Sequence, residues 1–354
     1  MDPSTLIPRD LPIPVEWGWF YLFQILTFVV HLLVMNAMLG AAIIALVHHL
    51  RGKAETEPLT LDISRKLPFT VAIAVNFGVA PLLFLQVLYG QFLYTSSVLM
   101  AVYWLSVVGL VIAAYASAYY YDFRYETLGS MRTLFTAVTA VCLLAVAFIF
   151  TNNMTLMLVP EDWTAYFDNA AGTILHFREP TLIPRYLHIV VSSVAVGGLF
   201  LSLVWHCKKN APEAPRWIAH GLDWYAFATM TQMATGLWFL WAMPERVKHL
   251  LLGGAPLHTL VFALGAVLGM ASISTALQRR VRLTTTLLLM TMVLMAYLRD
   301  LVRDAYLSPY FQVGQRTVTG EYLPLVLFIL TLAAGLAVLA WLLRTVARDM
   351  EVRS

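Results

Sequence analysis

The sequence contains little charge. Of its 354 residues, only 12% are Asp, Glu, Lys or Arg, whereas 60% are hydrophobic and the mean hydropathy is +0.74. A soluble globular protein carries about 25% charged residues, so this chain cannot cover a water-facing surface of its own size. The deficit excludes a soluble enzyme, a nucleic-acid-binding protein and a disordered scaffold. It indicates a polytopic membrane protein.

Cysteine is also scarce. Cys142 and Cys207 are the only two cysteines in the chain. They cannot form a disulfide framework, a CxxC zinc site or a CxxCH haem attachment. We therefore expect any c-type haem or iron–sulfur cluster that works with this chain to belong to a partner.

Long apolar runs dominate the sequence. A membrane helix needs about 20 mostly apolar residues, and this template predicts an all-α helical bundle with nine transmembrane helices. We expect one integral-membrane domain over 1–354, with a four-helix part (1–156), an outer loop (157–183) and a five-helix part (184–354). No internal repeat stands out. The predicted spans are 18–47, 68–92, 97–119, 132–156, 184–206, 222–243, 251–277, 283–306 and 322–345.

The basic residues lie mostly on one side of these spans. Fifteen of the 23 Lys and Arg residues fall in one alternating set of loops and the C-terminal tail. Cytoplasmic loops carry the excess of Lys and Arg in membrane proteins. The pattern predicts an N-terminus outside and a cytoplasmic C-terminus, which agrees with an odd number of spans.

Three histidines lie inside predicted spans. His31 is deep in the first, and His188 and His258 both belong to the outer third of the membrane. Imidazole in apolar surroundings is the standard protein ligand for haem iron. The alternative is a hydrogen bond from each histidine to a neighbouring helix. Three histidines inside the apolar spans favour ligation of haem iron over that alternative.

Asp300 and Arg303 lie on one helix face at the outer end of the eighth span. They could form a surface ion pair, which contributes little to stability. Alternatively, the carboxylate could bind a haem iron while the arginine neutralises a propionate. The spacing alone does not decide between the two.

Four segments carry a family resemblance. His31 lies nine residues before Gly40, and residues 78–90 read GVAPLLFLQVLYG; residues 179–188 read EPTLIPRYLH, and residues 300–303 read DLVR. They are similar, in order, to the haem-ligating first helix, the GVATGxxxEFQFG segment, the NPxxxxRFxH helix start and the ExGR motif of one family. The chain resembles the haem-bearing large subunit of cytochrome bd quinol oxidases.

The resemblance implies cofactors and a location. It implies that His31 ligates a high-spin haem, that His188 ligates a low-spin haem b, and that Gln86, Asp300 and Arg303 lie beside haem. It also implies quinol as substrate and a nine-span core in a bacterial inner membrane.

The departures from the family pattern bear on activity. Gln86 stands where the family has a glutamate, and a neutral amide cannot carry a proton or ligate iron as an anion. Asp300 is one methylene shorter than the family's glutamate. Val261 or Phe262 occupies the position of an axial methionine, and His258, one turn outward, could pair with His188 around one haem.

We therefore expect a haem b membrane subunit, with one to three haems, of a multisubunit quinone-linked electron-transfer complex. It would pass electrons between a membrane quinol and a periplasmic cytochrome c or iron–sulfur protein. One alternative is a divergent bd-type oxidase that reduces oxygen, and another is a haem-free structural paralogue that scaffolds a respiratory complex. A transporter ranks last, because inverted repeats and broken midplane helices are not evident.

Overall fold

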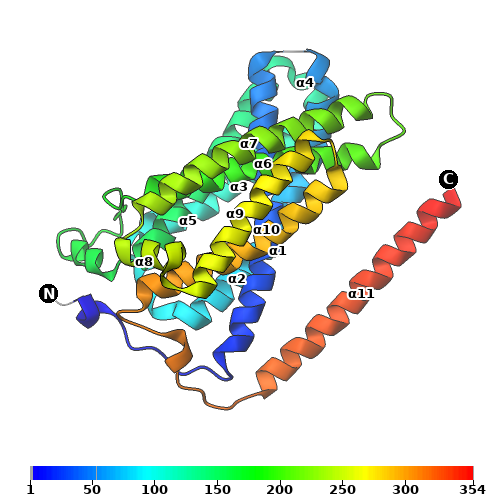
Figure 1. Ribbon diagram of the computed structural model, residues 1–354. Coiled ribbons are helices and arrows are strands. Elements are labelled where there is room, and N and C mark those ends of the chain that lie inside the picture. Colours follow the sequence, from blue (N-terminus) through cyan, green and yellow to red (C-terminus); the bar gives the residue numbers. More distant parts are fainter. Residues whose placement is uncertain (1–2, 53, 354) are drawn as a thin grey trace.

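The computed structural model describes residues 3–52 and 54–353, and these residues are almost entirely helical (Figure 1). The long helices are α1 (Trp17–Arg51), α2 (Glu57–Leu99), α3 (Ala101–Phe123), α5 (Arg132–Met157), α6 (Leu182–Cys207), α7 (Ala214–Ala242), α9 (Pro256–Leu277), α10 (Val281–Leu307) and α11 (Leu323–Arg353). Shorter segments connect them: η1 (Pro3–Leu6), η2 (Ala54–Thr56), α4 (Tyr125–Leu128), η3 (Gly129–Met131), η4 (Pro160–Phe167), α8 (Glu245–His249), the π-helical turn η5 (Leu250–Gly254) and η6 (Val313–Gln315).

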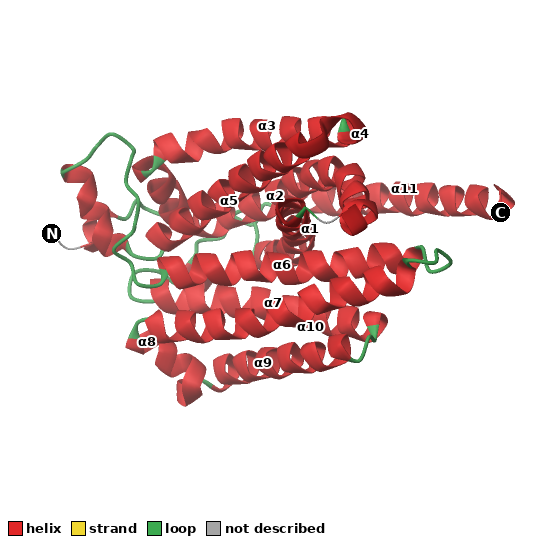
Figure 2. Cartoon of the chain, turned by 90° about the horizontal axis from the view of Figure 1, so that it is seen from above, coloured by secondary structure: helices red, strands yellow, loops and turns green. Residues whose placement is uncertain are grey.

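The helical membrane bundle predicted from composition is confirmed. Eight of the long helices in the described residues are long and apolar enough to cross a membrane. The remaining predicted span, 222–243, falls in α7, which has 29 residues. Its threonine, glutamine and aromatic residues lower its hydropathy, so α7 is not one of the eight. The two ends of the chain lie toward opposite ends of the bundle (Figures 1 and 2).

The bundle is built around the pair α1 and α6. Helix α1 packs against α2 and α6, α6 packs against α7, and the pairs α3–α5 and α9–α10 complete the two halves. Seen from above, α3 and α9 lie at opposite edges of the bundle (Figure 2). Helix α11 runs apart from it (Figure 1). Near its start, the ring of Phe328 lies 5.1 Å from that of Phe23 on α1.

Two glycines allow α1 and α6 to touch backbone to backbone. A Cβ at Gly40 would lie 1.8 Å from the Ser193 carbonyl oxygen, and one at Gly197 would lie 2.7 Å from the Gly40 Cα. Beside this contact, the Ser193 hydroxyl donates a 2.7 Å hydrogen bond to Asn36 Oδ1. Only glycine permits an approach this close.

Contacting residues on the two helices are separated by the same number of residues in the sequence. Ser193 lies 157 residues after Asn36, and the same separation relates Gly197 to Gly40 and His188 to His31. A constant separation between contacting residues means that α1 and α6 run parallel and in register at this crossing. The contact does not test the expectation that the sequence contains no internal repeat.

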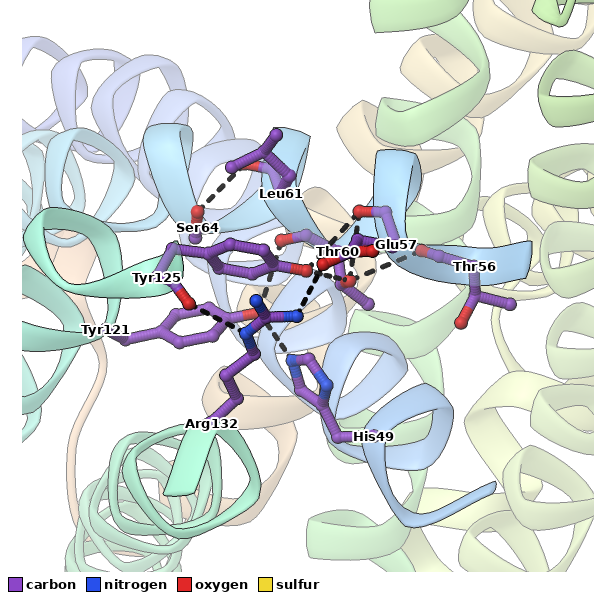
Figure 3. A network of polar contacts seen from close by, with 9 residues as sticks. All are labelled: His49, Thr56, Glu57, Thr60, Leu61, Ser64, Tyr121, Tyr125 and Arg132. Carbon is purple, nitrogen blue, oxygen red and sulfur yellow. Dashed lines mark hydrogen bonds and ion pairs between the residues drawn. The ribbon is translucent and has the colours of Figure 1, made fainter. Parts of the chain in front are cut away.

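A polar network ties four helices together where α1 ends and α2 begins (Figure 3). Arg132 on α5 forms a 2.7 Å ion pair with Glu57 on α2, and its guanidinium lies 4.0 Å from the centre of the Tyr125 ring. The Tyr121 hydroxyl of α3 lies 2.7 Å from His49 Nε2 of α1. The network fixes one end of the first half of the bundle.

Candidate cofactor site

His31 is held by α2 in a defined orientation. Its Nδ1 lies 3.1 Å from the carbonyl oxygen of Ala74. Because a carbonyl only accepts hydrogen bonds, Nδ1 carries the proton and Nε2 is the nitrogen with a free lone pair. The ring lies over Gly78, where a Cβ would be 2.9 Å from Cε1. A larger residue at position 78 would push the imidazole out of this position.

His188 is held by α7 in the same way. Its Nδ1 lies 3.2 Å from the carbonyl oxygen of Gln232, and a Cβ at Gly236 would lie 3.0 Å from His188 Cε1. The Gln232 side-chain amide is 3.5 Å from Nε2, at the outer limit of a hydrogen bond. The two histidines therefore have equivalent carbonyl and glycine neighbours on opposite sides of the α1–α6 crossing.

This arrangement is the one expected of metal-ligating histidines. Such residues almost always donate the second ring N–H to a carbonyl, a carboxylate or water, which fixes the tautomer and the ring plane. His31 and His188 both satisfy that requirement through a backbone carbonyl. In each, the lone pair is therefore on Nε2, the nitrogen that would bind haem iron; at His188 the Gln232 side-chain amide, 3.5 Å from Nε2, would have to move aside.

Asp300 and Arg303 are buried together on α10. Their residues are 2% and 3% exposed, and Arg303 Nη1 lies 2.8 Å from Asp300 Oδ1. Because both residues are buried, Asp300 and Arg303 do not form a surface ion pair. Within the described residues, Nη1 and Nη2 of Arg303 and Oδ1 of Asp300 lack a well-aligned hydrogen-bond partner. A buried guanidinium whose hydrogen bonds are only partly made is costly, so the remaining donors of Arg303 suit an anionic group such as a haem propionate.

Two further arginines belong to this region. The sequence placed Arg299 only among the charges of one side of the membrane, and it placed Arg185 in the motif at 179–188 without assigning it a role. Arg185 lies one turn before His188, and its guanidinium is 5.0 Å from the Phe239 ring centre. Arg299 lies 4.3 Å from the ring centre of Phe28, one turn before His31. Arg299 interacts electrostatically with both Arg185 and Arg303. The available signal was an arginine one turn before an intramembrane histidine, at Arg185, and an arginine directly before an intramembrane carboxylate, at Arg299.

His258 and Gln86 are placed differently. His258 Nδ1, on α9, is buried without a hydrogen-bond partner among the described residues. The polar contacts described for His188 come from α7, so pairing of His188 with His258 stays a prediction. Gln86 is exposed on α2, and no described contact joins it to His31 or His188.

Helix α2 breaks next to the Asp300–Arg303 pair. Tyr89 has non-helical angles (φ −132°, ψ 32°) in the middle of α2. The Arg316 guanidinium donates to the carbonyl oxygens of Leu88, at 3.0 Å, and of Val87. The Tyr89 ring lies 4.9 Å from the Arg303 guanidinium, and its hydroxyl donates a 2.5 Å hydrogen bond to Asp304. Neither Tyr89 nor Asp304 was identified from the sequence.

The loop after α5 contains buried and charged residues that connect it to the bundle. His176 is buried and forms an ion pair with Asp162 of η4. Glu161 accepts a hydrogen bond from Tyr310, which follows α10. These contacts fold the loop onto the end of the bundle where α5 and α10 end.

The whole chain is similar in structure to the bd oxidase from Geobacillus thermodenitrificans. The TM-score is 0.69, and the similarity covers 98% of this chain and 99% of that one, at 14% sequence identity. No family model matches the sequence, and no curated relative matches it. At this identity the likeness shows the fold alone. The predicted resemblance is confirmed at that level: the chain has the fold of a bd oxidase, in a divergent sequence.

Proposed function

We propose that this chain is a haem b membrane subunit of a multisubunit quinone-linked electron-transfer complex. The observation that carries the proposal is the pair of equivalent imidazoles, His31 and His188. Each is oriented by a backbone carbonyl and a glycine, so that the lone pair is on Nε2; at His188 this nitrogen faces the Gln232 side-chain amide at 3.5 Å. The bd-oxidase fold supports the same class of protein.

Each residue near the histidines has a role in this proposal. His31 and His188 would each hold one haem through Nε2, and a bound haem would supply one-electron redox chemistry. The arginines Arg185, Arg299 and Arg303 offer donors to propionates, with Arg303 oriented by Asp300. His258 is a candidate second axial ligand for the His188 site.

The proposed electron route runs between a membrane quinol and an outer partner, a cytochrome c or an iron–sulfur protein. Partner docking would use the end of the bundle where the loop of Asp162 and His176 folds. A transmembrane bundle supplies the apolar surroundings that a lipid-soluble quinol needs.

A divergent oxidase is the second candidate. The near-complete structural match to a bd oxidase favours it. Against it, Gln86 is neutral and exposed, whereas oxygen reduction requires a proton carrier close to a haem with an open coordination position. A high-spin haem that binds carbon monoxide, together with oxygen consumption, would support the oxidase.

The test is haem content and the optical spectrum of the purified chain and two variants. His31→Ala and His188→Ala should each lose one b-type haem in a pyridine haemochrome assay while the protein still inserts in the membrane. The matched control is His206→Ala, at the opposite end of α6 from His188, which should keep the full haem content. A colourless wild-type protein would refute the proposal and favour a haem-free scaffold.

A further inference from the structure

A cavity lies at the end of the bundle where α1 ends and α7 begins, and the proposed function does not use it. Its volume is about 360 Å³, and its walls come from α1, η2 and α7. The charged and imidazole-bearing side chains that line it are His48, Arg51, Glu55, Arg216, His220 and Asp223. Residues that are far apart in the sequence therefore meet around one polar space.

The two histidines of the cavity are fixed by a third aromatic residue. His48 is 4% exposed, and its Nε2 lies 3.0 Å from Nε2 of the half-buried His220. The indole N–H of Trp224 donates to the same nitrogen of His220 at 3.1 Å. Because an indole N–H only donates, His220 Nε2 is an acceptor, and the ring proton of neutral His220 is on Nδ1. No acceptor pairs with this N–H among the described residues, so His220 can donate to an anion.

Two arginines from different helices lie beside His220. Arg216, in the first turn of α7, has its guanidinium 4.8 Å from the ring centre of Trp217, and its Nη2 lies 2.8 Å from Glu55 Oε2. Arg51 is the last residue of α1, and it has no ion-pair partner in the part of the chain that the structure describes. Both arginines interact electrostatically with His220. The cavity therefore offers two guanidinium groups close to one imidazole.

The two carboxylates at the cavity are already paired. Asp223 Oδ1 lies 2.7 Å from Nη1 of Arg279, and Glu55 pairs with Arg216. With Arg51, three guanidinium groups face these two carboxylates, which leaves one positive charge in excess. No three potential metal ligands come together within the described residues. The charge balance therefore favours an anion, rather than a metal ion, as the ligand of this cavity.

We propose that this cavity binds a phosphate group, carried either by an anionic phospholipid or by a soluble phosphate. Arg51 and Arg216 donate to the phosphate oxygens, and His220 adds its Nδ1–H. Guanidinium donors match phosphate oxygens in geometry and charge, and basic pockets between membrane helices bind anionic headgroups. Glu55 competes with the phosphate for Arg216, so binding exchanges an exposed ion pair for contacts to the ligand. The bound group joins α1 to α7.

The first test titrates inorganic phosphate into the purified chain in a non-ionic detergent and follows binding by calorimetry. Arg51→Gln and Arg216→Gln should each weaken binding about tenfold or more, because each removes a charge-assisted hydrogen bond. Glu55→Gln should instead strengthen binding by up to about fivefold, because it releases Arg216 from an exposed ion pair. The matched control is Arg65→Gln, which removes the same charge from an exposed position near the start of α2 and should leave binding unchanged.

The second test separates the two sources of phosphate. Native mass spectrometry of the chain from micelles with equal amounts of phosphatidylglycerol and phosphatidylcholine should show one retained phosphatidylglycerol if a lipid is the ligand, with the same order among the variants. Lipid retention without binding of inorganic phosphate assigns the site to a headgroup, and the reverse assigns it to a soluble phosphate. Binding of neither, or an equal loss in Arg51→Gln and Arg65→Gln, would overturn the proposal. Neither test involves haem, so that failure would leave the proposed function intact.

Discussion

The α1–α6 crossing predicts a large effect of one added methyl group. In Gly40→Ala the new Cβ would lie 1.8 Å from the Ser193 carbonyl oxygen, 2.7 Å from its carbon and 2.9 Å from the Gly197 Cα. Favourable contact begins at about 3.5 Å, so the α6 backbone would have to move by about 1.7 Å. All three obstacles are backbone atoms, which cannot rotate away as a side chain can.

The expected cost follows from that displacement. Overpacking a tight contact typically costs about 1–3 kcal/mol, and the rigid obstacles place this site at the upper end. Separation of the helices would also break the Ser193–Asn36 hydrogen bond, which contributes about 1 kcal/mol. We expect Gly40→Ala to lower the free energy of unfolding by about 4 kcal/mol.

The assay is reversible denaturation in mixed detergent micelles. Unfolding can be followed by thiol labelling of the half-buried Cys142, in a background where the exposed Cys207 is replaced by serine. Gly109→Ala on α3 is the matched control, because a Cβ there has no atom within 4 Å. It should be neutral or stabilising by up to about 1 kcal/mol, since alanine is the better helix former.

The reasoning fails if Gly40→Ala unfolds within about 0.5 kcal/mol of the wild type, the range of ordinary surface substitutions. It also fails if the control loses as much stability as Gly40→Ala. Because His31 and His188 lie on the two helices that would separate, haem should be lost from both proposed sites together.

Two smaller effects are expected where α1 ends and α2 begins. Tyr121→Phe removes the hydroxyl that lies 2.7 Å from His49 Nε2 and donates to the Thr60 carbonyl oxygen, and should cost about 1 kcal/mol of unfolding free energy; the exposed Tyr120→Phe should cost nothing measurable. Asp62→Asn weakens contacts of 2.6 and 2.7 Å to the Lys208 ammonium and should lower the free energy of unfolding by about 1–2 kcal/mol in the same assay. Glu55 forms an exposed ion pair with Arg216, so Glu55→Gln should lower it by less than about 1 kcal/mol.

The helices were predictable because each needs only a sufficiently long apolar run, and the runs are long here. The close α1–α6 contact was not, because it is made by backbone atoms at Gly40 and Gly197. The matching carbonyl and glycine neighbours of His31 and His188 also become visible only in the structure. A contact between two glycines involves no apolar side chains, so it produces no hydrophobic periodicity in the sequence.

The candidate site was predictable only in part. His31 and His188 stand out because few ionisable residues occur inside apolar spans. Arg185 and Arg299 lie near the outer ends of predicted spans, where an arginine also reports topology. The position of Gln86 beside haem was expected from its motif and stays a prediction, and α2 breaks three residues later at Tyr89. One helical period therefore cannot place the residues on both sides of the break.

Helix α10 makes the two histidine sites different from each other. Two consecutive turns carry Arg299, Asp300, Arg303 and Asp304, and they reach α1 through Phe28 and α2 through Tyr89. The corresponding last helix of the first half, α5, instead buries neutral residues near its end, including an asparagine pair at 152–153. This charge cluster on α10, which has no equivalent near the end of α5, makes the surroundings of the two histidines different. Under the proposed function, the anionic groups of a cofactor are therefore expected to lie toward α10, where Arg299 and Arg303 supply positive charge.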